Sequence, residues 1–600
     1  MYILGISCSN DGTAALIRDG EIVAIAAEER FSRVKMHLGF PRRAIISCLE
    51  QAGISAREVD TIVFSFLDYL RAHPFYTNAL VSDKGCMDIE NELSLGMFAG
   101  EFMRQASRGD RISLSLKKFS EKNGVTTKKI YADVFKDLGF DDPKIATADH
   151  HLAHAAGAYY TSGRDRCLII TADGYGDGYS STMGTGIDGK IARLYGTPYT
   201  DSPGVFYTSV TKYLGFKSHR HEGKITGLAA YGDPETCYEV MKECFRFDKS
   251  RFYAPRLINT SLYEFRLMMR LLKGNFFRHP QMNFTIDYFK KRLKGAKPAD
   301  VAAAAQKRLE DCMVAYVKEA VDNTGLTDIV MAGGVFGNVK LNQRIAQIPK
   351  VTSLFIHPDM GDGGTALGAA FIEWEKELSK RGKSFLGKRL NNVYFGPEYT
   401  DKNIEDALKK YSLPYEFHKD IECRIARLIS EKKIIGRFNG RLEYGPRALG
   451  NRSIIAEPTD KTINDWLNKR LRRTEFMPFA PSVLDRAAPS LYKDYSKAAY
   501  AAEFMTITFD VEPHAQKMAP AVCHIDNTAR PQVVTKEQNP SYYKIIEEFE
   551  KITGIPIIVN TSFNMHEEPI VCTPEDAIRA FLDGSVDYLA LGNYLIKGRG

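Results

Sequence analysis

The sequence predicts an α/β protein whose strands form mixed or parallel sheets. Tyr2–Ser7 has the apolar character of a buried strand, and a polar turn at 10–13 leads from it into a β-hairpin. Helical stretches separate the later strand-like runs, as expected when strands are joined by helices. An alanine-rich helix at 301–321 leads into one of these strands. The later strands are expected at 61–65, 167–171, 329–332 and 353–356.

The expected elements also locate a domain boundary. After the helix expected near 365–378, the stretch 379–392 is polar and loses apolar periodicity. We therefore expect two domains, at 1–380 and 390–600. The rest of the hairpin and the helix that follows it are expected at 14–18, 21–27 and 42–53.

The segment 245–297 is rich in basic and aromatic residues, with RFYAPRL and GNFFRHP among its runs. This composition is compatible with two structures. It favours a substrate-facing insertion if the side chains are exposed, and a helical packing element if the rings are buried. The sequence leaves both interpretations open.

Composition excludes several classes of protein. The 600 residues are 44% hydrophobic and 26% charged, which suits ordinary cores. The net charge of +7 reflects 81 basic against 74 acidic residues and by itself predicts no nucleic-acid partner. We find no run long enough to cross a bilayer and no signal-like leader, so no membrane association is expected. Ten scattered cysteines without a CxxC pair favour a cytoplasmic protein with reduced thiols.

Four glycine-rich turns follow predicted strands directly. Backbone N–H groups at a strand end can bind phosphate oxygens, often together with a helix N-terminus. Four such turns favour a nucleotide or phosphoryl site, and ordinary hairpin turns are the alternative. They are SNDGT at 9–13, DGYGDG at 173–178, GGVFGN at 333–338 and GDGGTALGAA at 361–370.

A second stretch, NGRLEYGPRALGNRS at 439–453, holds three arginines and three glycines beside the basic cluster KRLRR at 469–473. Glycine lets a backbone approach a ligand closely, and a guanidinium binds two phosphate or carboxylate oxygens at once. The stretch therefore suits a phosphate-rich ligand. A solvated basic face is the alternative.

The motif DHHLAHAA at 149–156 places His150 and His154 four residues apart. On a helix both imidazoles share one face, which lets them bind one metal ion, while His151 would point elsewhere. A carboxylate from another strand end, Asp173 or Asp362, could complete a set suited to Fe(II), Mn(II) or Zn(II). Packing or surface histidines are the alternative.

Motifs along nearly the whole chain resemble those of the O-carbamoyltransferases that modify antibiotics, nodulation factors and related natural products. So many motifs in one order make the resemblance specific. They are AAEERFSRVKMHLGFP (26–41), DHHLAHAA, EGKITGLAAYG (222–232), GGVFGNVKLN (333–342), GDGGTALGAA, GPRALGNRS (445–453), PFAPSV (478–483) and NTSFNMHEEPIVCTPEDA (560–577).

The resemblance implies a two-domain enzyme. Its N-terminal domain would have the duplicated α/β fold of the ASKHA type, as in the metal-binding protein that transfers threonylcarbamoyl to tRNA. Its C-terminal domain would have the YrdC-like α/β fold and would form carbamoyl adenylate from carbamoyl phosphate and ATP with Mg²⁺, releasing phosphate and pyrophosphate. The N-terminal domain would then move the carbamoyl group to a hydroxyl of a small-molecule acceptor and release AMP. A homodimer is expected from the family alone.

The resemblance also implies a metal site in the N-terminal domain. His150, His154 and Asp362 match the family's ligands, and Asp173 matches a further acidic position near the metal and nucleotide. Iron is expected first in this fold, with manganese or zinc as alternatives. The metal would hold nucleotide phosphates and polarise the carbamoyl group.

Nucleotide and phosphate contacts are implied in both domains. Gly333, Gly334 and Asn338 would line the nucleotide pocket, and Lys224 could reach a phosphate or pair with Glu222. In the C-terminal domain, arginines would neutralise the phosphates of ATP and carbamoyl phosphate, and polar side chains would add contacts. These residues are Arg447, Arg452, Arg472, Arg530, Asn560 and Ser562.

The chain departs from the family pattern where the acceptor hydroxyl would lose its proton. Asn10 stands where many members have a histidine that is a candidate general base, and asparagine takes up no proton at neutral pH. Asp11, His151 or a histidine of HRHEG could act instead, the acceptor could be activated differently, or transfer could be impaired. Further departures are Arg472, Thr474 and His566, where a lysine, an arginine and a basic residue are usual. The expected catalytic residues are Asp11, Asn10, Arg447 and Arg530.

Two other functions would use less of the chain. A metal-dependent ATPase or kinase of the ASKHA superfold would explain the glycine turns but not GPRALGNRS or NTSFN. A non-catalytic nucleotide-binding member would explain Asn10. The sequence does not identify the acceptor, because loops dispersed along the chain form such a pocket.

Overall fold

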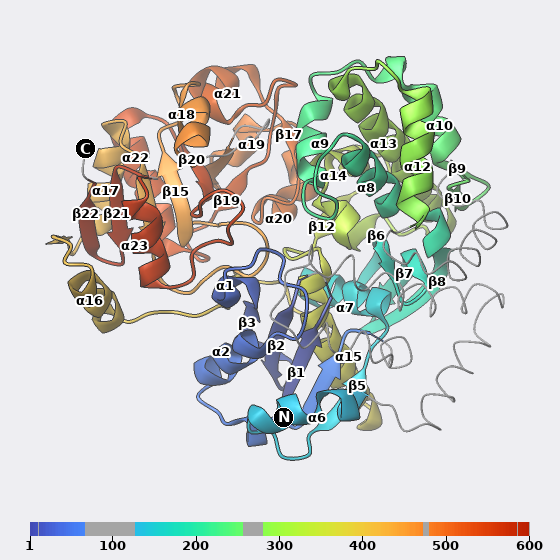
Figure 1. Ribbon diagram of the computed structural model, residues 1–600, viewed down its shortest axis with the longest axis horizontal. Coiled ribbons are helices and arrows are strands. Elements are labelled where there is room, and N and C mark those ends of the chain that lie inside the picture. Colours follow the sequence, from blue (N-terminus) through green and yellow to red (C-terminus); the bar gives the residue numbers. More distant parts are fainter. Residues whose placement is uncertain (10, 67–126, 256–279, 472–478, 585, 599–600) are drawn as a thin grey trace, which may run out of the picture. The chain divides into compact units, whose positions relative to one another are not determined.

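The computed structural model describes the chain except residues 10, 67–126, 256–279, 472–478, 585 and 599–600 (Figure 1). Two compact units make up the chain. The first comprises Met1–Val351 and Asp359–Arg389, and the second comprises Thr352–Pro358 and Leu390–Gly600. The predicted α/β class is confirmed. The inclusion of Thr352–Pro358, which holds strand β12 (Ser353–Ile356), in the second unit had no signal in the sequence.

The first sheet of the first unit begins with the predicted hairpin. Its order is β3-β2-β1-β4-β5, with β1 antiparallel to β2 and parallel to β4. The aromatic rings of Phe64 and Tyr131 stack in its core with centroids 5.0 Å apart, which ties helix α6 to the sheet. The strands are β1 (Tyr2–Ser7), β2 (Thr13–Arg18), β3 (Glu21–Ala27), β4 (Thr61–Phe64) and β5 (Lys144–Thr147).

A second sheet in this unit repeats the strand order of the first. Strands β6, β7 and β8 form a meander, and β11 then lies parallel to β6 as β4 lies parallel to β1. The five-stranded order β12-β11-β6-β7-β8 thus corresponds to β5-β4-β1-β2-β3. The strands are β6 (Arg166–Gly176), β7 (Tyr179–Ile187), β8 (Lys190–Pro198) and β11 (Asp328–Ala332).

Helices α7 (His150–Ser162) and α15 (Thr365–Lys380) pack closely because a glycine faces the contact. A Cβ placed on Gly368 would lie 1.8 Å from the carbonyl oxygen of Ala153, so no larger residue fits. Both helices begin at glycine-rich or histidine-rich motifs, so this contact fixes the two motifs relative to each other. The other helices of the unit are α1 (Glu29–Ser32), α2 (Arg42–Ala52), α6 (Thr127–Asp137), α8 (Pro203–Tyr213), α9 (Glu222–Ala229), α10 (Tyr238–Cys244), α12 (Pro280–Arg292), α13 (Pro298–Thr324) and α14 (Val339–Ala346).

The described part of the segment 245–297 favours the packing interpretation. Phe245 and Phe252 are fully buried, and their rings stack on each other and against Phe206 and Tyr316. Phe245 directly precedes β9 (Arg246–Asp248), and Phe252 lies on β10 (Arg251–Tyr253), which pairs with β9 in a small hairpin. Most of the run GNFFRHP lies outside the described residues. The aromatic residues of RFYAPRL therefore contribute to a core.

The second unit is built on an eight-stranded mixed sheet with the order β13-β22-β21-β14-β15-β20-β16-β19. Apolar side chains of α17 and α22 pack with those of the central strands to form its core. The strands are β13 (Glu416–Phe417), β14 (Ile435–Phe438), β15 (Arg452–Ala456), β16 (Ala480–Leu484), β19 (Gln532–Val534), β20 (Ile557–Ser562), β21 (Tyr588–Leu591) and β22 (Tyr594–Lys597), with β17 (Phe509–Asp510) and β18 (Thr528–Ala529) in a separate pair. The helices are α16 (Asp401–Lys410), α17 (Ile421–Ser430), α18 (Ile463–Arg470), α19 (Ala488–Leu491), α20 (Ala499–Ala502), α21 (Pro513–Met518), α22 (Pro540–Thr553) and α23 (Pro574–Leu582).

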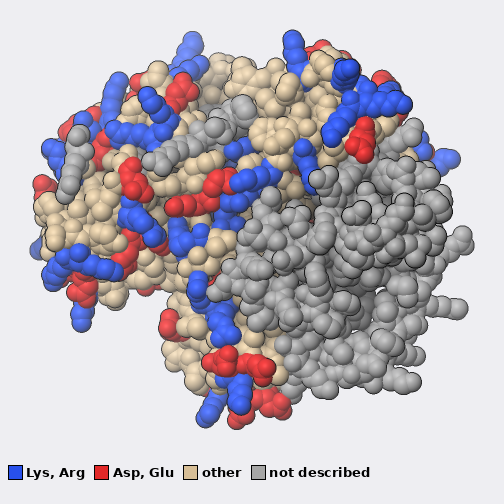
Figure 2. Space-filling model, viewed as in Figure 1, with Lys and Arg blue, Asp and Glu red and all other residues tan. Residues whose placement is uncertain are grey.

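The surface agrees with the mild net charge. Lysine and arginine side chains intersperse with aspartate and glutamate over the described part of the face in Figure 2. Among the described residues, no helix is both long enough and apolar enough to span a bilayer.

Candidate active site: a histidine–aspartate cluster and an arginine loop

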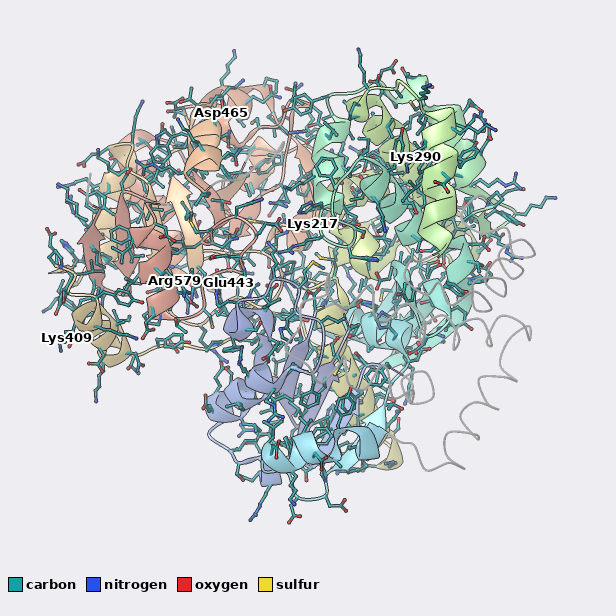
Figure 3. All side chains as sticks on the ribbon, viewed as in Figure 1. Lys217, Lys290, Lys409, Glu443, Asp465 and Arg579 are labelled. Atoms are coloured by element: carbon teal, nitrogen blue, oxygen red, sulfur yellow. The ribbon has the colours of Figure 1, made fainter. Side chains whose placement is uncertain are left out.

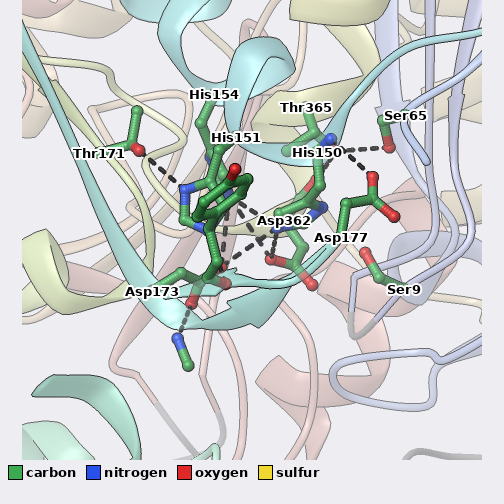
Figure 4. A network of polar contacts seen from close by, with 12 residues as sticks. Ser9, Ser65, His150, His151, His154, Thr171, Asp173, Asp177, Asp362 and Thr365 are labelled. Carbon is green, nitrogen blue, oxygen red and sulfur yellow. Dashed lines mark hydrogen bonds and ion pairs between the residues drawn. The ribbon is translucent and has the colours of Figure 1, made fainter. Parts of the chain in front are cut away.

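Four side chains of the first unit converge on one point (Figure 4). His150 and His154 lie one turn apart on α7, and their Nε2 atoms are 3.2 Å from each other. Asp173 reaches them from β6, with its Oδ2 atom 3.4 Å and 3.2 Å from the two Nε2 atoms. Asp362 reaches them from the turn before α15, at 3.6 Å and 3.7 Å. The structure thus brings together all four predicted metal ligands.

The spacing of these atoms fits a single metal ion. Ligand nitrogen and oxygen atoms bound at about 2.0–2.2 Å from one ion lie roughly 3–4 Å apart. The four atoms here all lie within 4.8 Å of one another, and the histidine and aspartate distances are 3.2–3.7 Å. Two imidazoles and two carboxylates suit a first-row ion such as iron, manganese or zinc.

Neighbouring residues fix the orientation of His150. Asp177 accepts a hydrogen bond from the backbone N–H of His150 at 2.8 Å. Gly176 leaves space for the imidazole, because a Cβ at that position would lie 2.0 Å from Cδ2 of His150. Asp149 caps α7 by accepting from the N–H of Leu152 and pairs with Arg193 on β8. The turn DGYGDG therefore supports the cluster through packing as well as through a ligand.

Electrostatics make the cluster a set of paired charges. Burial lowers the pKa of His150, but the hydrogen bond to Asp173 and the charges of Asp362, Asp173 and Asp177 outweigh it and raise the pKa to about 9. Burial raises the pKa of Asp173, but its bonds to the two histidines hold it well below its ordinary value. A metal ion and a proton therefore compete for the same imidazole lone pair.

The third histidine of the motif is held away from the cluster. Nδ1 of His151 lies 2.8 Å from the hydroxyl of Thr171, and Nε2 lies 3.0 Å from the carbonyl oxygen of Tyr179. Burial, followed by the charges of His150 and His154, lowers the pKa of His151 to about 3. Both ring nitrogens serve internal contacts, which does not favour His151 as a general base.

Asp11 lies beside the cluster in the turn between β1 and β2. A Cβ on Gly361 would lie 3.5 Å from Oδ2 of Asp11, which places this carboxyl next to the residue that precedes Asp362. Burial and then the negative charges of Glu29, Asp359 and Asp362 raise the pKa of Asp11 well above its ordinary value. A carboxyl with a raised pKa takes up a proton more readily than an ordinary aspartate. Asn10, its predicted catalytic neighbour, lies outside the described residues.

The predicted nucleotide residues occupy three places in the first unit. Gly333 has a φ of 110°, and a Cβ there would lie 2.1 Å from the carbonyl oxygen of Ala172, so glycine is required. Gly334 is exposed, and a Cβ on it would lie 3.0 Å from Oδ1 of Asp173. Asn338 is buried and caps α14, and Lys224 lies on α9. Gly333 and Gly334 thus lie beside the metal cluster.

In the second unit, the arginine stretch is a loop between β14 and β15. Arg447 is half-buried within it. Glu443, four residues earlier, is 4% exposed, and its Oε1 atom accepts hydrogen bonds from three backbone N–H groups of the loop. Figure 3 labels Glu443 within this unit. One charged residue of the stretch, Glu443, therefore holds the loop in its conformation.

Arg452 is directed into the unit. Its side chain is fully buried and lies over the ring of Phe438 at 3.6 Å from the centroid. Its NH1 and NH2 groups donate to the carbonyl oxygens of Asn439 at 2.7 Å and Gly440 at 3.0 Å. The predicted phosphate contact of Arg452 would require it to give up these bonds.

The remaining predicted residues of this unit differ in exposure. Asn560 is 1% exposed, and its Nδ2 group lies in a buried network with Ser482 and Gln532 at 3.0 Å and 2.9 Å. Arg530 and Ser562 are half-buried. Arg472 and Thr474 lie outside the described residues.

Family profiles match both units. The profile "Carbamoyltransferase N-terminus" matches residues 2–371, and "Carbamoyltransferase C-terminus" matches residues 426–598. The chain belongs to the carbamoyltransferase family. It is therefore an enzyme that transfers carbamoyl groups, and the resemblance seen in the motifs is confirmed. The first match contains the metal cluster, and the second contains the arginine loop.

The sequence relatives of this carbamoyltransferase span both units. The nodulation protein NolNO of Sinorhizobium fredii is 32% identical over 98% of this chain and 79% of its own. An uncharacterized protein of Methanocaldococcus jannaschii is 32% identical over 99% of both chains. Among solved structures, T. kodakarensis HypF aligns with 62% of this chain and 48% of its own, at 16% identity and a TM-score of 0.32.

Three residues of the carbamoyltransferase sites were missed from the sequence: Gly176, Asp177 and Glu443. The first two lie in the recognised turn DGYGDG, but their contact with His150 joins segments far apart in the chain. Glu443 had a signal, because it is the only acidic residue in the basic stretch 439–453. A lone carboxylate among arginines indicates internal charge pairing.

Proposed function

We propose that this carbamoyltransferase is an ATP-dependent O-carbamoyltransferase that divides two reactions between its two units. The second unit forms carbamoyl adenylate from carbamoyl phosphate and ATP. The first unit transfers the carbamoyl group to a hydroxyl of a small natural-product acceptor. The presence of both family domains in one chain supports this division.

The chemistry of the first reaction explains the need for arginines. Water cleaves carbamoyl phosphate to carbamate and inorganic phosphate, and a carbamate oxygen then attacks the α-phosphorus of ATP as pyrophosphate leaves. Several negative charges must be brought together, which guanidinium groups at fixed positions favour. Arg447 and Arg530 are half-buried and are our first candidates for these contacts, and Ser562 on β20 is a candidate polar contact.

The second reaction needs a bound metal, an activated hydroxyl and a leaving AMP. His150, His154, Asp173 and Asp362 would hold the metal. When bound, the ion supplies Lewis acidity toward phosphate or carbonyl oxygen. The acceptor oxygen attacks the carbamoyl carbon, AMP leaves, and a base takes up the hydroxyl proton. Asp11 is our candidate for that base, because its carboxyl lies next to the cluster and has a raised pKa.

The convergence of two histidines and two aspartates from α7, β6 and the turn before α15 supports this function most strongly. These residues lie up to 212 positions apart in the chain, from His150 to Asp362, yet their ligand atoms lie within 4.8 Å. A chain with only a structural histidine pair does not require two additional carboxylates at this distance.

Pyrophosphate release tests the first reaction. The purified protein is incubated with ATP and Mg²⁺, with and without carbamoyl phosphate. We expect release only with carbamoyl phosphate, and at least a 100-fold loss in Arg447→Ala. Arg486→Ala is the matched control, because Arg486 is an exposed arginine of the same unit that pairs with Glu550 on the surface. Equal pyrophosphate release with and without carbamoyl phosphate would favour an ATPase instead.

AMP release tests the second reaction. Carbamoyl adenylate formed by the enzyme is offered a panel of hydroxyl compounds, and the products are measured by mass spectrometry. We expect a carbamate ester and one AMP for each transfer, with Asp11→Asn much slower than wild type. Pyrophosphate release without any carbamoylated product across a broad panel would contradict the transfer proposal.

A further inference from the structure

The loop that contains Arg447 is held by one carboxylate. Oε1 of Glu443 lies 2.8 Å from the backbone nitrogens of Leu449 and Asn451 and 3.0 Å from that of Arg452. Hydrogen bonds from backbone N–H groups to a carboxylate are stronger than those to a neutral acceptor. Three backbone donors on one oxygen therefore define the path of the chain shortly after Arg447.

Buried side chains hold the carbonyl groups of the same loop. Asn560 donates to the carbonyl oxygen of Ala448 at 3.3 Å, and the Arg437 NH1 group donates to that of Gly450 at 2.7 Å. The carbonyl oxygen of Leu449 accepts from Tyr394 and Gln532, each at 2.8 Å. The loop has no helix or strand of its own between β14 and β15. Its conformation is thus set by side-chain contacts, and Glu443 supplies three of them from within the loop.

We propose that Glu443 is a positioning residue that presents Arg447 to carbamoyl phosphate. This inference rests on the proposed function and names a residue that acts through Arg447 rather than touching substrate. Arg447 is two residues before the first held N–H group, so a shift of the loop moves the guanidinium directly. Misplacement of a binding group by about 1 Å can cost on the order of 100-fold in rate.

Glu443 also balances buried positive charge, and the test must distinguish this effect from the positioning of Arg447. Its negative charge offsets the buried guanidinium groups of Arg437 and Arg452, whose pKa values burial lowers and Glu443 raises. A residue that served charge balance alone would be replaceable by any carboxylate. A residue that positions the loop needs its oxygen at the distance that Glu443 provides.

Two conservative substitutions separate these roles. Glu443→Gln keeps an acceptor oxygen at the same distance and removes the charge, whereas Glu443→Asp keeps the charge and withdraws the oxygen by one methylene. In the pyrophosphate-release assay, we expect kcat/KM for carbamoyl phosphate to fall about 10-fold or more in Glu443→Asp. In Glu443→Gln we expect the fold-decrease to be less than half of that value. The KM for ATP is expected to stay within about 2-fold in both.

A double-mutant cycle tests whether the effect passes through Arg447. In an Arg447→Ala background, Glu443→Asp is expected to cause no further loss, because the group it positions is gone. Asp576→Asn is the matched control. Asp576 is also a buried carboxylate that accepts from two backbone N–H groups, those of Cys572 and Thr573, but it caps α23. It should lower stability and leave kcat/KM for carbamoyl phosphate unchanged.

Amide hydrogen exchange adds a readout that needs no turnover. Faster exchange confined to residues 448–452 in Glu443→Asp is expected. Unchanged exchange there, a greater loss of kcat/KM in Glu443→Gln than in Glu443→Asp, or additive losses with Arg447→Ala would each overturn the inference. Absence of release in the wild type would overturn the proposed function, whereas normal release in Glu443→Asp would overturn this inference alone.

Discussion

The two candidate sites of this chain are built in opposite ways. In the first unit, ligands from three distant segments meet at one point, and each segment contributes only one or two of them. In the second unit, the conspicuous residues lie within fifteen positions, 439–453, and the structure separates them. Arg452 is fully buried against backbone carbonyl groups, while Arg447 is half-buried.

This difference shows that density of charged residues in a sequence and density at a site are separate properties. In a compact basic motif, some of the charges must be paired and the loop must be held in one conformation before a ligand can bind. Part of the motif therefore serves the fold. A cluster formed from distant segments needs no such residues within one loop, because each ligand is held by the helix, strand or turn that carries it. We therefore expect mutations in the first unit to act mainly on activity, and mutations in the loop to divide between stability and activity.

The largest expected effect is on the metal cluster. His154→Ala removes one of two nitrogen ligands, so we expect loss of bound metal and at least a 1,000-fold loss of carbamoyl transfer. Pyrophosphate release by the second unit should stay within about 2-fold. Metal analysis and the two half-reaction assays measure this, with His418→Ala as control, because His418 is a half-buried histidine of the second unit that pairs with Glu416. Loss of both half-reactions in a folded, stable protein would break the proposed separation.

The next effect separates the two arginines of the loop. Arg452→Ala leaves buried carbonyl groups without donors, and we expect it to destabilise the second unit by about 3 kcal/mol. Arg447→Ala is expected to change stability by less than about 1 kcal/mol. Urea unfolding of both variants gives the comparison. A stable Arg452→Ala protein with a raised KM for carbamoyl phosphate would instead support the phosphate contact predicted from the sequence.

A smaller effect is expected behind the metal ligands. In Gly176→Ala the new methyl group would displace the imidazole of His150, so we expect about 10- to 100-fold weaker metal binding. Gly174→Ala is the matched control in the same turn, since a Cβ there meets no atom within 4 Å. Metal titration of both variants measures the difference. Equal affinity in the two would show that the ring does not depend on this space.

The smallest effect concerns the histidine that the cluster does not use. His151→Leu removes two buried hydrogen-bond partners, those of Thr171 and Tyr179, and should destabilise the first unit by about 2 kcal/mol. Metal stoichiometry is expected to remain that of the wild type. Thermal unfolding and metal analysis check both points. Loss of transfer with unchanged stability would return His151 to the list of candidate bases.

The fold class and the pairing of His150 with His154 were predictable from local patterns, whereas Asp173 and Asp362 together were expected only from the family resemblance. Strand and helix periodicity identified the elements, and the spacing of His150 and His154 placed two ligands on one helix face. The division of labour between Arg447 and Arg452 was not predictable, since both are arginines in one glycine-rich loop. Burial decides between them, and burial depends on Phe438 and on carbonyl groups that only the folded chain brings near. The duplicated strand order likewise arises from topology and leaves no repeat in the sequence.

The segment Thr352–Pro358 limits how this enzyme can be divided in the laboratory. It lies within the first family profile and supplies β12 to the sheet β12-β11-β6-β7-β8, yet it belongs to the second compact unit, where Phe355 stacks on Tyr500 and His357 lies against Tyr444. A fragment cut at Leu390 would therefore expose the faces of Tyr500 and Tyr444 that these rings cover.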